Sequence, residues 1–367
     1  MDNTHWKRIV IKCGSALIAP KQNGCSSHYL LSIAHFILRC RERGIDVVLV
    51  SSGSVAAGRH LFADQDKSIA AKKAMAAAGQ TEMMATWDKL FDFATAQILL
   101  THADLRDRER YESIRNTIDS LVDNGILPIV NENDTVTTDK LKVGDNDNLS
   151  AMVAAAFDAD ALIICSDVDG LYDKNPHKYD DAKLLSWISE IDESTYRMAG
   201  DAVSDVGTGG MKTKIQAAEK ATSHGIDTFI VNGFTELSFN QLLAGKNPGT
   251  HFQPHAKPLS DHQHWMTHTA KAQGELIVNE EFDAPAEKAS EELTGATLKE
   301  VKGQFNVGDT VLITKQDGTK IAKARSNYSS CLLSFIAEQE NPEYADEFQK
   351  NTGPILSDKN IAILENS

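Results

Sequence analysis

Ile126-Leu-Pro-Ile-Val130 is an apolar run that passes directly into the polar segment Asn131-Glu-Asn-Asp134. Farther along the chain, Gly144-Asp-Asn-Asp-Asn148 leads into the apolar stretch Ala151-Met-Val-Ala-Ala-Ala156. A strand, a polar loop and a helix in this order predict one unit of an α/β fold. Asp accepts hydrogen bonds from an ammonium group and Asn can donate to a carboxylate. The polar segments therefore suit a small amino acid as ligand.

The same alternation continues through the first two thirds of the chain. The predicted strands are Ile9–Ile11, Val47–Val50, Ile126–Val130, Ala161–Cys165 and Thr228–Val231, and the predicted helices are Tyr29–Arg43, Ser68–Phe93, Arg108–Asp123 and Lys212–His224. Short apolar runs between longer helices predict an α/β domain with a mostly parallel sheet. Ligands of such open sheets bind outside the carboxyl ends of the strands. We therefore expect the polar segments that follow the strands to meet at one edge.

Composition and charge limit the classes of function. The 367 residues carry a formal net charge of -15, which argues against a general nucleic-acid binder and against docking on anionic membranes. The chain shows no hydrophobic signal region and no apolar run of membrane-spanning length, so we expect a cytoplasmic protein. The five cysteines are widely spaced without a CxxC pair, which favours reduced, small apolar residues over a metal site.

From about Leu259 the pattern changes to shorter strand-like segments such as Glu275–Val278 and Thr310–Thr314. Four histidines near this change have no cysteine beside them, so solvated side chains are favoured over zinc binding: His251, His255, His262 and His264. The predicted domain boundaries are 1–258 for the α/β domain, 259–273 for a linker and 274–367 for a small β-rich domain with a C-terminal tail.

Gly207-Thr-Gly-Gly-Met-Lys-Thr-Lys214 opens a predicted helix and favours phosphate binding. Glycines let backbone amides approach an anion, and the helix N-terminus and the lysines add positive potential. The segment is not a P-loop, because Met211 separates Gly210 from Lys212. By itself it equally fits a flexible connection. Lys12, at the end of the first strand, and Lys214 can approach one phosphoryl group from two sides.

Asp145-Asn-Asp147 has the acidic spacing of a calcium loop. The EF-hand pattern requires a polar residue where Leu149 stands and glycine where Ser150 stands. We therefore reject calcium binding.

Together these motifs closely resemble the glutamate 5-kinases, a branch of the amino-acid kinase family, over nearly all of residues 8–256. The motifs are Ile11–Ser15, Val50–Gly58, Leu100–Thr101, Asn131–Asp134, Val143–Ala151, Asp167–Tyr172, Gly207–Lys214 and Gly249–Thr250 with Phe252. The resemblance implies a three-layer sandwich around the parallel sheet. It also implies ATP-dependent phosphorylation of the γ-carboxylate of L-glutamate to γ-glutamyl phosphate, the first step of proline biosynthesis from glutamate.

The resemblance assigns roles to individual residues. It implies that Lys12 and Lys214 stabilise the transferring phosphoryl group and that Asp147 holds both lysines in place. The implied glutamate-binding residues are Ser52, Asp134 and Asn146, and the implied ATP-binding residues are Lys12, Ser166, Asp167, Thr208, Gly209, Gly210, Met211, Lys212, Thr213 and Lys214. Mg²⁺ is expected to bridge the ATP phosphates without a direct protein ligand. A glutamate carboxylate is ionised at neutral pH, so no general base is expected.

Residues 274–337 resemble the PUA domain, a small β module often linked to RNA. The matching segments are Val301–Phe305, Gly308–Val311, Ile321–Ala322 and Asn327–Ser330, and the departures are Glu291–Thr297 and Lys323–Ala324. Residues 271–367 contain 10 Lys and Arg against 17 Asp and Glu, a net charge of -7, which is the wrong sign for a phosphate-binding surface. A structural or regulatory role is favoured over RNA binding.

The resemblance further implies feedback inhibition by proline and assembly into a homo-oligomer. Glutamate-5-semialdehyde dehydrogenase is an expected partner, because γ-glutamyl phosphate is labile. Two alternatives stay open. One keeps the fold and changes the acceptor, as in the related kinases of aspartate, acetylglutamate, carbamate or uridylate. The other is an RNA-binding or scaffold protein that has lost catalysis.

Overall fold

The computed structural model describes most of the chain. The described residues are 6–21, 24–62, 68–137, 146–176, 178–199, 210–256, 258–279, 282, 293–295, 297–337 and 354–364. The chain divides into two compact units, Met1–Pro258 and Leu259–Ser367, and each is described by itself.

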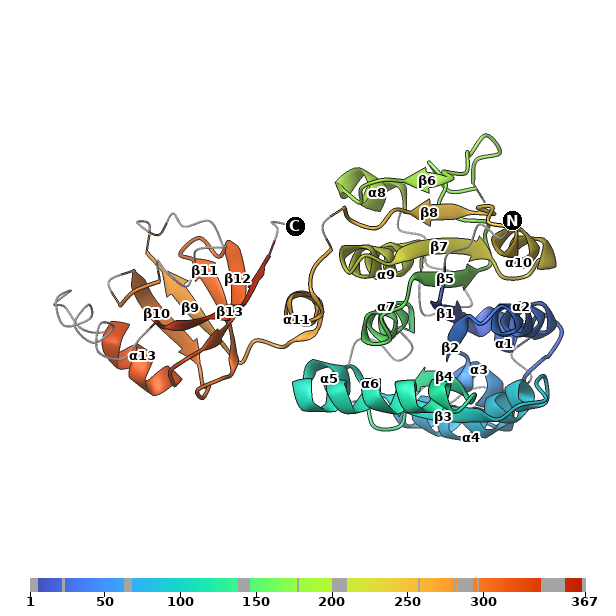
Figure 1. Ribbon diagram of the computed structural model, residues 1–367, viewed down its shortest axis with the longest axis horizontal. Helices are drawn as coiled ribbons and strands as arrows, with labels where there is room; N and C mark the ends of the chain where they lie inside the picture. The colour runs from blue at the N-terminus through green and yellow to red at the C-terminus, as the bar shows by residue number, and fades with distance from the viewer. Residues whose placement is uncertain are drawn as a thin grey trace. The chain divides into compact units, whose positions relative to one another are not determined.

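The first unit is built on an eight-stranded sheet with the strand order β3-β4-β2-β1-β5-β7-β8-β6 (Figure 1). The strands are β1 Arg8–Cys13, β2 Asp46–Ser51, β3 Thr95–Leu100, β4 Leu127–Glu132, β5 Ala161–Ser166, β6 Trp187–Ile188, β7 Asp227–Asn232 and β8 Thr250–Phe252. Every neighbouring pair is parallel except β7 with β8. The prediction of an α/β fold with a mostly parallel central sheet is confirmed.

Helices cover both faces of this sheet (Figure 1). They are α1 Ser15–Ile18, α2 Leu30–Glu42, α3 Ser54–Gly58, α4 Ile69–Asp88, α5 His102–Arg106, α6 Arg108–Asp123, α7 Asn146–Ala156, α8 Glu193–Met198, α9 Met211–Ser223 and α10 Glu236–Leu243. On one face of the sheet, α7 packs on β1 and β5, and α9 packs on β7. On the other face, α2 packs against both β2 and α10. The arrangement is the expected three-layer sandwich.

Several observed elements differ from the predicted ones. The helix predicted over Ser68–Phe93 ends at Asp88. The edge strand β3 was missed, because it is only half-buried and lacks a continuous apolar run. Helix α7 already begins at Asn146, five residues before the predicted apolar helix, because its first turn carries polar side chains.

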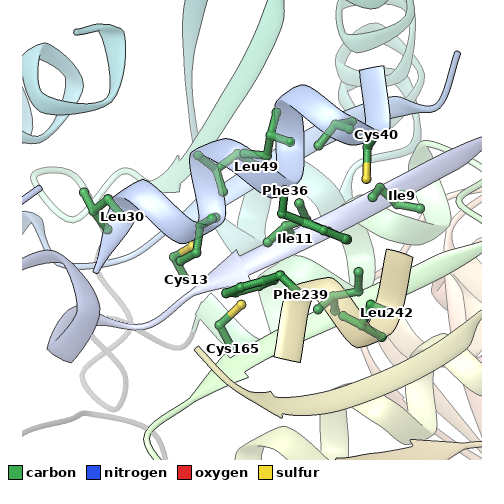
Figure 2. Close-up of a cluster of buried hydrophobic side chains, with 14 of the residues drawn as sticks. Ile9, Ile11, Cys13, Leu30, Phe36, Cys40, Leu49, Cys165, Phe239 and Leu242 are labelled. Carbon is green, nitrogen blue, oxygen red and sulfur yellow. The ribbon is translucent and has the colours of Figure 1, made fainter. Parts of the chain in front are cut away.

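A cluster of apolar side chains fills the space between the sheet and α2 and α10 (Figure 2). Ile9, Ile11 and Cys13 of β1 point into it, together with Phe36 of α2 and Phe239 of α10. Side chains alternate along a strand, so Val10 and Lys12 lie on the opposite face, against α7. This alternation directs Lys12 away from the apolar core.

All five cysteines are free. Cys13, Cys40 and Cys165 are buried, as expected for small apolar residues, whereas Cys25 is half-buried and Cys331 is exposed. Burial raises the pKa of the Cys40 thiol to about 12, so this group stays protonated at neutral pH.

The second unit is a five-stranded sheet with the order β10-β9-β11-β12-β13 and a helix, α13. Its elements are β9 Gly274–Val278, β10 Leu298–Gly303, β11 Thr310–Lys315, β12 Lys320–Ser326, α13 Ser330–Ala337 and β13 Leu356–Ile363. A separate apolar core, which includes Leu276, Ile313 and Leu333, holds this sheet together. This sheet confirms the prediction that the C-terminal region is rich in β-strands.

The segment expected as a linker is folded onto the second unit. It contains α11 Asp261–His264 and a wide helical turn over Trp265–Thr269, and Trp265 and Met266 are buried. Lys323 Nζ of β12 donates to the backbone carbonyls of Thr267 at 3.0 Å and Ala270 at 2.9 Å. These contacts explain why the segment is not an exposed connection.

Two of the histidines near this segment are not solvated as expected. His264 is buried, and His251 stacks on Phe229 and pairs with Asp227 at 2.5 Å. Within the part of the chain that the structure describes, no three His, Cys, Asp or Glu side chains gather as metal ligands. Among the same residues, no helix combines the length and apolar character needed to cross a bilayer.

Candidate active site

The carboxyl ends of five parallel strands carry polar residues to one edge of the sheet, as the sequence predicted. Lys12 stands near the end of β1, Ser52 follows β2, Glu132 ends β4, Ser166 ends β5 and Asn232 ends β7. The strands are parallel and hydrogen-bonded neighbours, so these ends lie next to one another. The edge therefore gathers polar side chains that are separated by more than two hundred residues in sequence.

Two lysines meet on one carboxylate at this edge. Lys12 Nζ lies 2.6 Å from Asp147 Oδ1, and Lys214 Nζ lies 3.4 Å from Asp147 Oδ2. Asp147 is only 2% exposed, and both lysines are also buried. A buried carboxylate between two ammonium groups leaves one unit of positive charge in a site shielded from water. Such a site attracts anions.

The fold brings these three side chains together through helix packing. Asp147 lies in the first turn of α7 and Lys214 in the first turn of α9, and these two helices pack against each other. Thr213 Oγ1 lies 2.7 Å from Asp147 Oδ2 and fixes the carboxylate from the same turn as Lys214. Because α7 also packs on β1, Lys12 reaches Asp147 from the strand.

The charges of the two lysines decide the ionisation of Asp147. Burial by itself would raise the pKa of this carboxyl, but Lys12 and Lys214, with hydrogen bonds from Lys12 and Thr213, hold its pKa well below the ordinary value. Asp147 is therefore a carboxylate at neutral pH.

A second polar cluster surrounds Asn131, at the end of β4. Asn131 Nδ2 donates to Gln80 Oε1 at 2.8 Å and, more weakly, to Ser54 Oγ at 3.4 Å. Asn131 Oδ1 accepts from Asn146 Nδ2 at 3.1 Å. Ser54 Oγ in turn lies 3.2 Å from Asp134 Oδ2 and donates to it. Residues from α3, α4, β4 and α7 are thus joined by one network.

Asp134 has an environment unlike that of Asp147. It is 5% exposed, and no cation pairs with it among the described residues. Burial raises its pKa, and the hydrogen bond from Ser54 offsets only part of this rise. A cationic ligand beside Asp134 would remove this penalty, as an α-ammonium group can.

The remaining predicted residues divide into four groups. Ser52 is buried at the end of β2, with its backbone N–H bonded to Cys13 O at 3.0 Å. Ser166 Oγ donates to Asp167 Oδ1 at 3.2 Å beside the end of β5. Gly210 caps the N-terminus of α9, whose first residues are Met211, Lys212, Thr213 and Lys214. Thr208 and Gly209 lie outside the described residues.

Three residues of the second cluster were not among the predicted site residues: Ser54, Gln80 and Asn131. Ser54 and Asn131 stand inside motifs that the sequence singled out, next to residues that were assigned roles. Gln80 follows Gly79 in an alanine-rich helix, and nothing in that stretch indicates a ligand. Only the packing of α4 brings Gln80 to Asn131.

Comparisons with known proteins show which family this chain belongs to. The amino acid kinase family profile matches residues 7–232. Glutamate 5-kinase 1 of Pseudoalteromonas translucida is 63% identical over 368 residues, and glutamate 5-kinase of Idiomarina loihiensis is 51% identical over 371 residues; both matches cover 100% of each chain. The solved UMP kinase of Bacillus anthracis is 17% identical with a TM-score of 0.49, over 68% of this chain and 97% of its own.

The chain therefore belongs to the amino acid kinase family, and within that family to the glutamate 5-kinases. It is an enzyme.

Proposed function

We propose that this enzyme transfers the γ-phosphoryl group of ATP to the γ-carboxylate of L-glutamate. A carboxylate oxygen forms the new bond to the γ-phosphorus, and the bond from that phosphorus to the β–γ bridging oxygen breaks. The products are γ-glutamyl phosphate and ADP. The acceptor oxygen is already ionised at neutral pH, so no group has to remove a proton.

The observation that carries this proposal is the contact of Lys12 and Lys214 with the two oxygens of Asp147. Phosphoryl transfer depends on positioning and on neutralising charge at the equatorial and leaving oxygens. Two ammonium groups fixed from a strand and a helix can face the transferring group from two directions. Asp147 orients them and is itself not a nucleophile, because both of its oxygens face cations.

The second cluster supports binding of an amino acid. Asp134 Oδ1 and Asn146 Oδ1 are buried acceptors without a hydrogen-bond partner among the described residues. An α-ammonium group would satisfy both. Ser52, at the end of β2, completes the proposed glutamate-binding set. Asn146 and Asp147 are consecutive, so the amino-acid cluster and the lysine pair adjoin each other.

The first turn of α9 is the proposed phosphate-binding element. The backbone N–H groups at a helix N-terminus and the side chains of Lys212 and Lys214 favour an anion there. Ser166 and Asp167 would border the nucleotide from the end of β5. A divalent ion, which we propose to be Mg²⁺, would enter with ATP and neutralise phosphate charge. Asp147 does not suit that ion as a ligand, because both of its oxygens already face ammonium groups.

The finer expectations from the resemblance are kept as part of this proposal. They place the reaction first in proline biosynthesis, in the cytoplasm, with proline as an inhibitor that competes for the amino-acid cluster. They also include a homo-oligomer and glutamate-5-semialdehyde dehydrogenase as the acceptor of the labile product. For the PUA-like second unit, the net charge of -7 over residues 271–367 favours a structural or regulatory role over RNA binding.

The test is an acceptor screen with purified full-length enzyme, ATP and Mg²⁺. Hydroxylamine traps an acyl phosphate as the hydroxamate, and coupled ADP release reports turnover. We expect both signals with L-glutamate. Aspartate, acetylglutamate, carbamate and UMP, offered under the same conditions, should give much lower rates. A hydroxamate signal with another acceptor and none with glutamate would reject the proposed substrate.

A further inference from the structure

One backbone amide fixes the orientation of every carboxamide in the second cluster. Glu132 N–H donates to Asn131 Oδ1 at 2.8 Å, and a backbone N–H can only donate. The other end of the Asn131 carboxamide is therefore Nδ2, a donor. The atom of Gln80 that it contacts at 2.8 Å must be the acceptor Oε1. Gln80 Nε2 is thereby turned away from Asn131.

Gln80 Nε2 is a buried donor with no hydrogen-bond partner among the described residues. The same holds for the acceptors Asp134 Oδ1 and Asn146 Oδ1 of this network. A buried polar group without a partner is costly, so a site that carries several of them indicates a ligand. One donor and two acceptors match an α-amino acid, whose carboxylate accepts and whose ammonium donates.

The contacts of Gln80 and Asn146 with Asn131 indicate which of the two carboxylates of a bound acceptor lies beside Gln80. Asn146 contacts the Oδ1 end of the Asn131 carboxamide and Gln80 contacts the Nδ2 end. Asn146 directly precedes Asp147, which contacts the two lysines. We therefore assign the Asn146 end of the Asn131 carboxamide to the side of the proposed phosphoryl group, and the Gln80 end to the opposite side. The carboxylate beside Gln80 is then the one that is not phosphorylated.

We propose that Gln80 donates from Nε2 to the α-carboxylate of the acceptor and so selects an acceptor with a free carboxylate at the α-carbon. This inference rests on the proposed function and adds a specificity-determining residue to it. Oε1 of the same side chain remains bonded to Asn131, which holds the donor in place.

The packing of α4 makes this placement rigid. A Cβ on Gly79 would stand 2.0 Å from Ser54 O and 2.4 Å from Gly58 N, so α4 lies directly on the backbone of α3. Gln80 is the next residue of α4, and Ser54 is the first residue of α3. The close contact of the two helices therefore sets the positions of Gln80 and Ser54 together.

The test compares L-glutamate with L-isoglutamine, which keeps the γ-carboxylate and replaces the α-carboxylate with a carboxamide. Gln80→Glu retains an acceptor for Asn131 and exchanges the Nε2 donor for a carboxylate oxygen. We expect kcat/KM for glutamate to fall about ten- to a hundredfold, through KM. The loss for isoglutamine should be much smaller, because its amide can donate to the new carboxylate. KM for ATP should stay unchanged.

Gln97→Glu is the matched control, because Gln97 is exposed on the edge strand β3. It makes the same chemical change away from the cluster and should leave both acceptors unaffected. Gln80→Leu is a second variant, which also removes the Nε2 donor and can be used if Gln80→Glu does not fold. It should raise KM for glutamate about tenfold and leave 4-aminobutyrate, which has no α-carboxylate, unaffected.

Equal losses for glutamate and isoglutamine in Gln80→Glu, or for glutamate and 4-aminobutyrate in Gln80→Leu, would overturn the inference. Such a result would mean that Gln80 only supports Asn131. The wild-type enzyme tests the proposed function separately. If the wild type phosphorylates glutamate and both Gln80 variants keep the wild-type KM for glutamate, only the proposed role of Gln80 is rejected. Wild-type enzyme without glutamate activity rejects the proposed function itself.

Discussion

Gly58 and Gly79 lie backbone against backbone where α3 crosses α4. A Cβ on Gly58 would stand 2.1 Å from Met75 O, and a Cβ on Gly79 would stand 2.4 Å from Gly58 N. Neither glycine has a positive φ, so packing and not backbone conformation excludes a side chain at both positions. The contact joins a helix that follows β2 to the helix that carries Gln80.

Gly79→Ala should destabilise the enzyme. Alanine is favoured over glycine in a helix by about 1 kcal/mol, but forcing a methyl group into a packed contact costs about 1–3 kcal/mol. Because the obstacle is backbone, α4 must shift, and Gln80 shifts with it. Thermal unfolding should show a lower Tm, and KM for glutamate should rise. Ala77→Gly, at an exposed position of α4, is the control that weakens the helix without changing KM. An unchanged Tm in Gly79→Ala would contradict the packing argument.

Lys214→Met should mainly lower kcat. Removal of one group that stabilises charge in the transition state costs roughly a hundred- to a thousandfold in rate. Lys12 remains to pair with Asp147, so the carboxylate keeps one partner. Steady-state kinetics at saturating glutamate and ATP measure the effect, and Lys72→Met, on the exposed side of α4, controls for the loss of a lysine. If kcat in Lys214→Met equals that of the control, Lys214 does not act on the phosphoryl group.

Asp134→Ala should mainly raise KM for glutamate. The carboxylate is buried without a cation, and a bound ammonium group is the partner that we propose for it. The KM for ATP should stay near the wild-type value. Because burial raises the pKa of Asp134, acidification should weaken glutamate binding at a pH above the ordinary carboxyl value, and the variant should lack this change. A variant with higher KM for ATP and unchanged KM for glutamate would place Asp134 elsewhere.

Asp147→Asn should change how stability depends on pH. In the folded wild type the pKa of Asp147 is held below the ordinary value of about 3.9. At a pH between the folded and the unfolded pKa of Asp147, the unfolded chain binds more protons than the folded protein. The stabilisation that Asp147 contributes is therefore fully present above about pH 4 and is lost as the pH falls toward the folded pKa. Urea unfolding at pH 7, 4 and 3 should therefore show the difference between wild type and variant shrinking in acid.

At neutral pH, Asp147→Asn leaves two buried ammonium groups without a counter-charge. Breaking a buried ion pair in this way costs roughly 3–5 kcal/mol. Asp134 has a raised pKa, so its contribution to the free energy of unfolding changes with pH in the opposite direction. This contribution is present in both wild type and Asp147→Asn, and subtracting one unfolding free energy from the other cancels it. A stability difference that stays constant from pH 7 to pH 3 would show that Asp147 has an ordinary pKa.

Periodic patterns predicted the central elements of the fold well. Helix α6 has the predicted bounds Arg108–Asp123, and α2 and α9 differ from prediction by one residue at each end. Buried strands and amphipathic helices are encoded by neighbouring residues, which a sequence displays directly. The edge strand β3 was missed because only one of its six residues is buried, so it lacks a continuous apolar run. The folded segment over residues 259–273 was missed because its burial depends on contacts with β12 and β13.

In the candidate site, too, the sequence predicts the local position of single residues, whereas the packing of helices and strands decides which residues meet. Local sequence is enough to place Lys12 at the end of an apolar strand and Lys214 in the first turn of a helix, because both positions follow from the order of apolar and polar residues. The meeting of both lysines on Asp147 depends on how α7, α9 and β1 pack. Gln80 enters the second polar cluster only because two glycines let α4 approach α3. A contact between two backbones does not produce a periodic pattern of apolar residues, so the sequence does not reveal it.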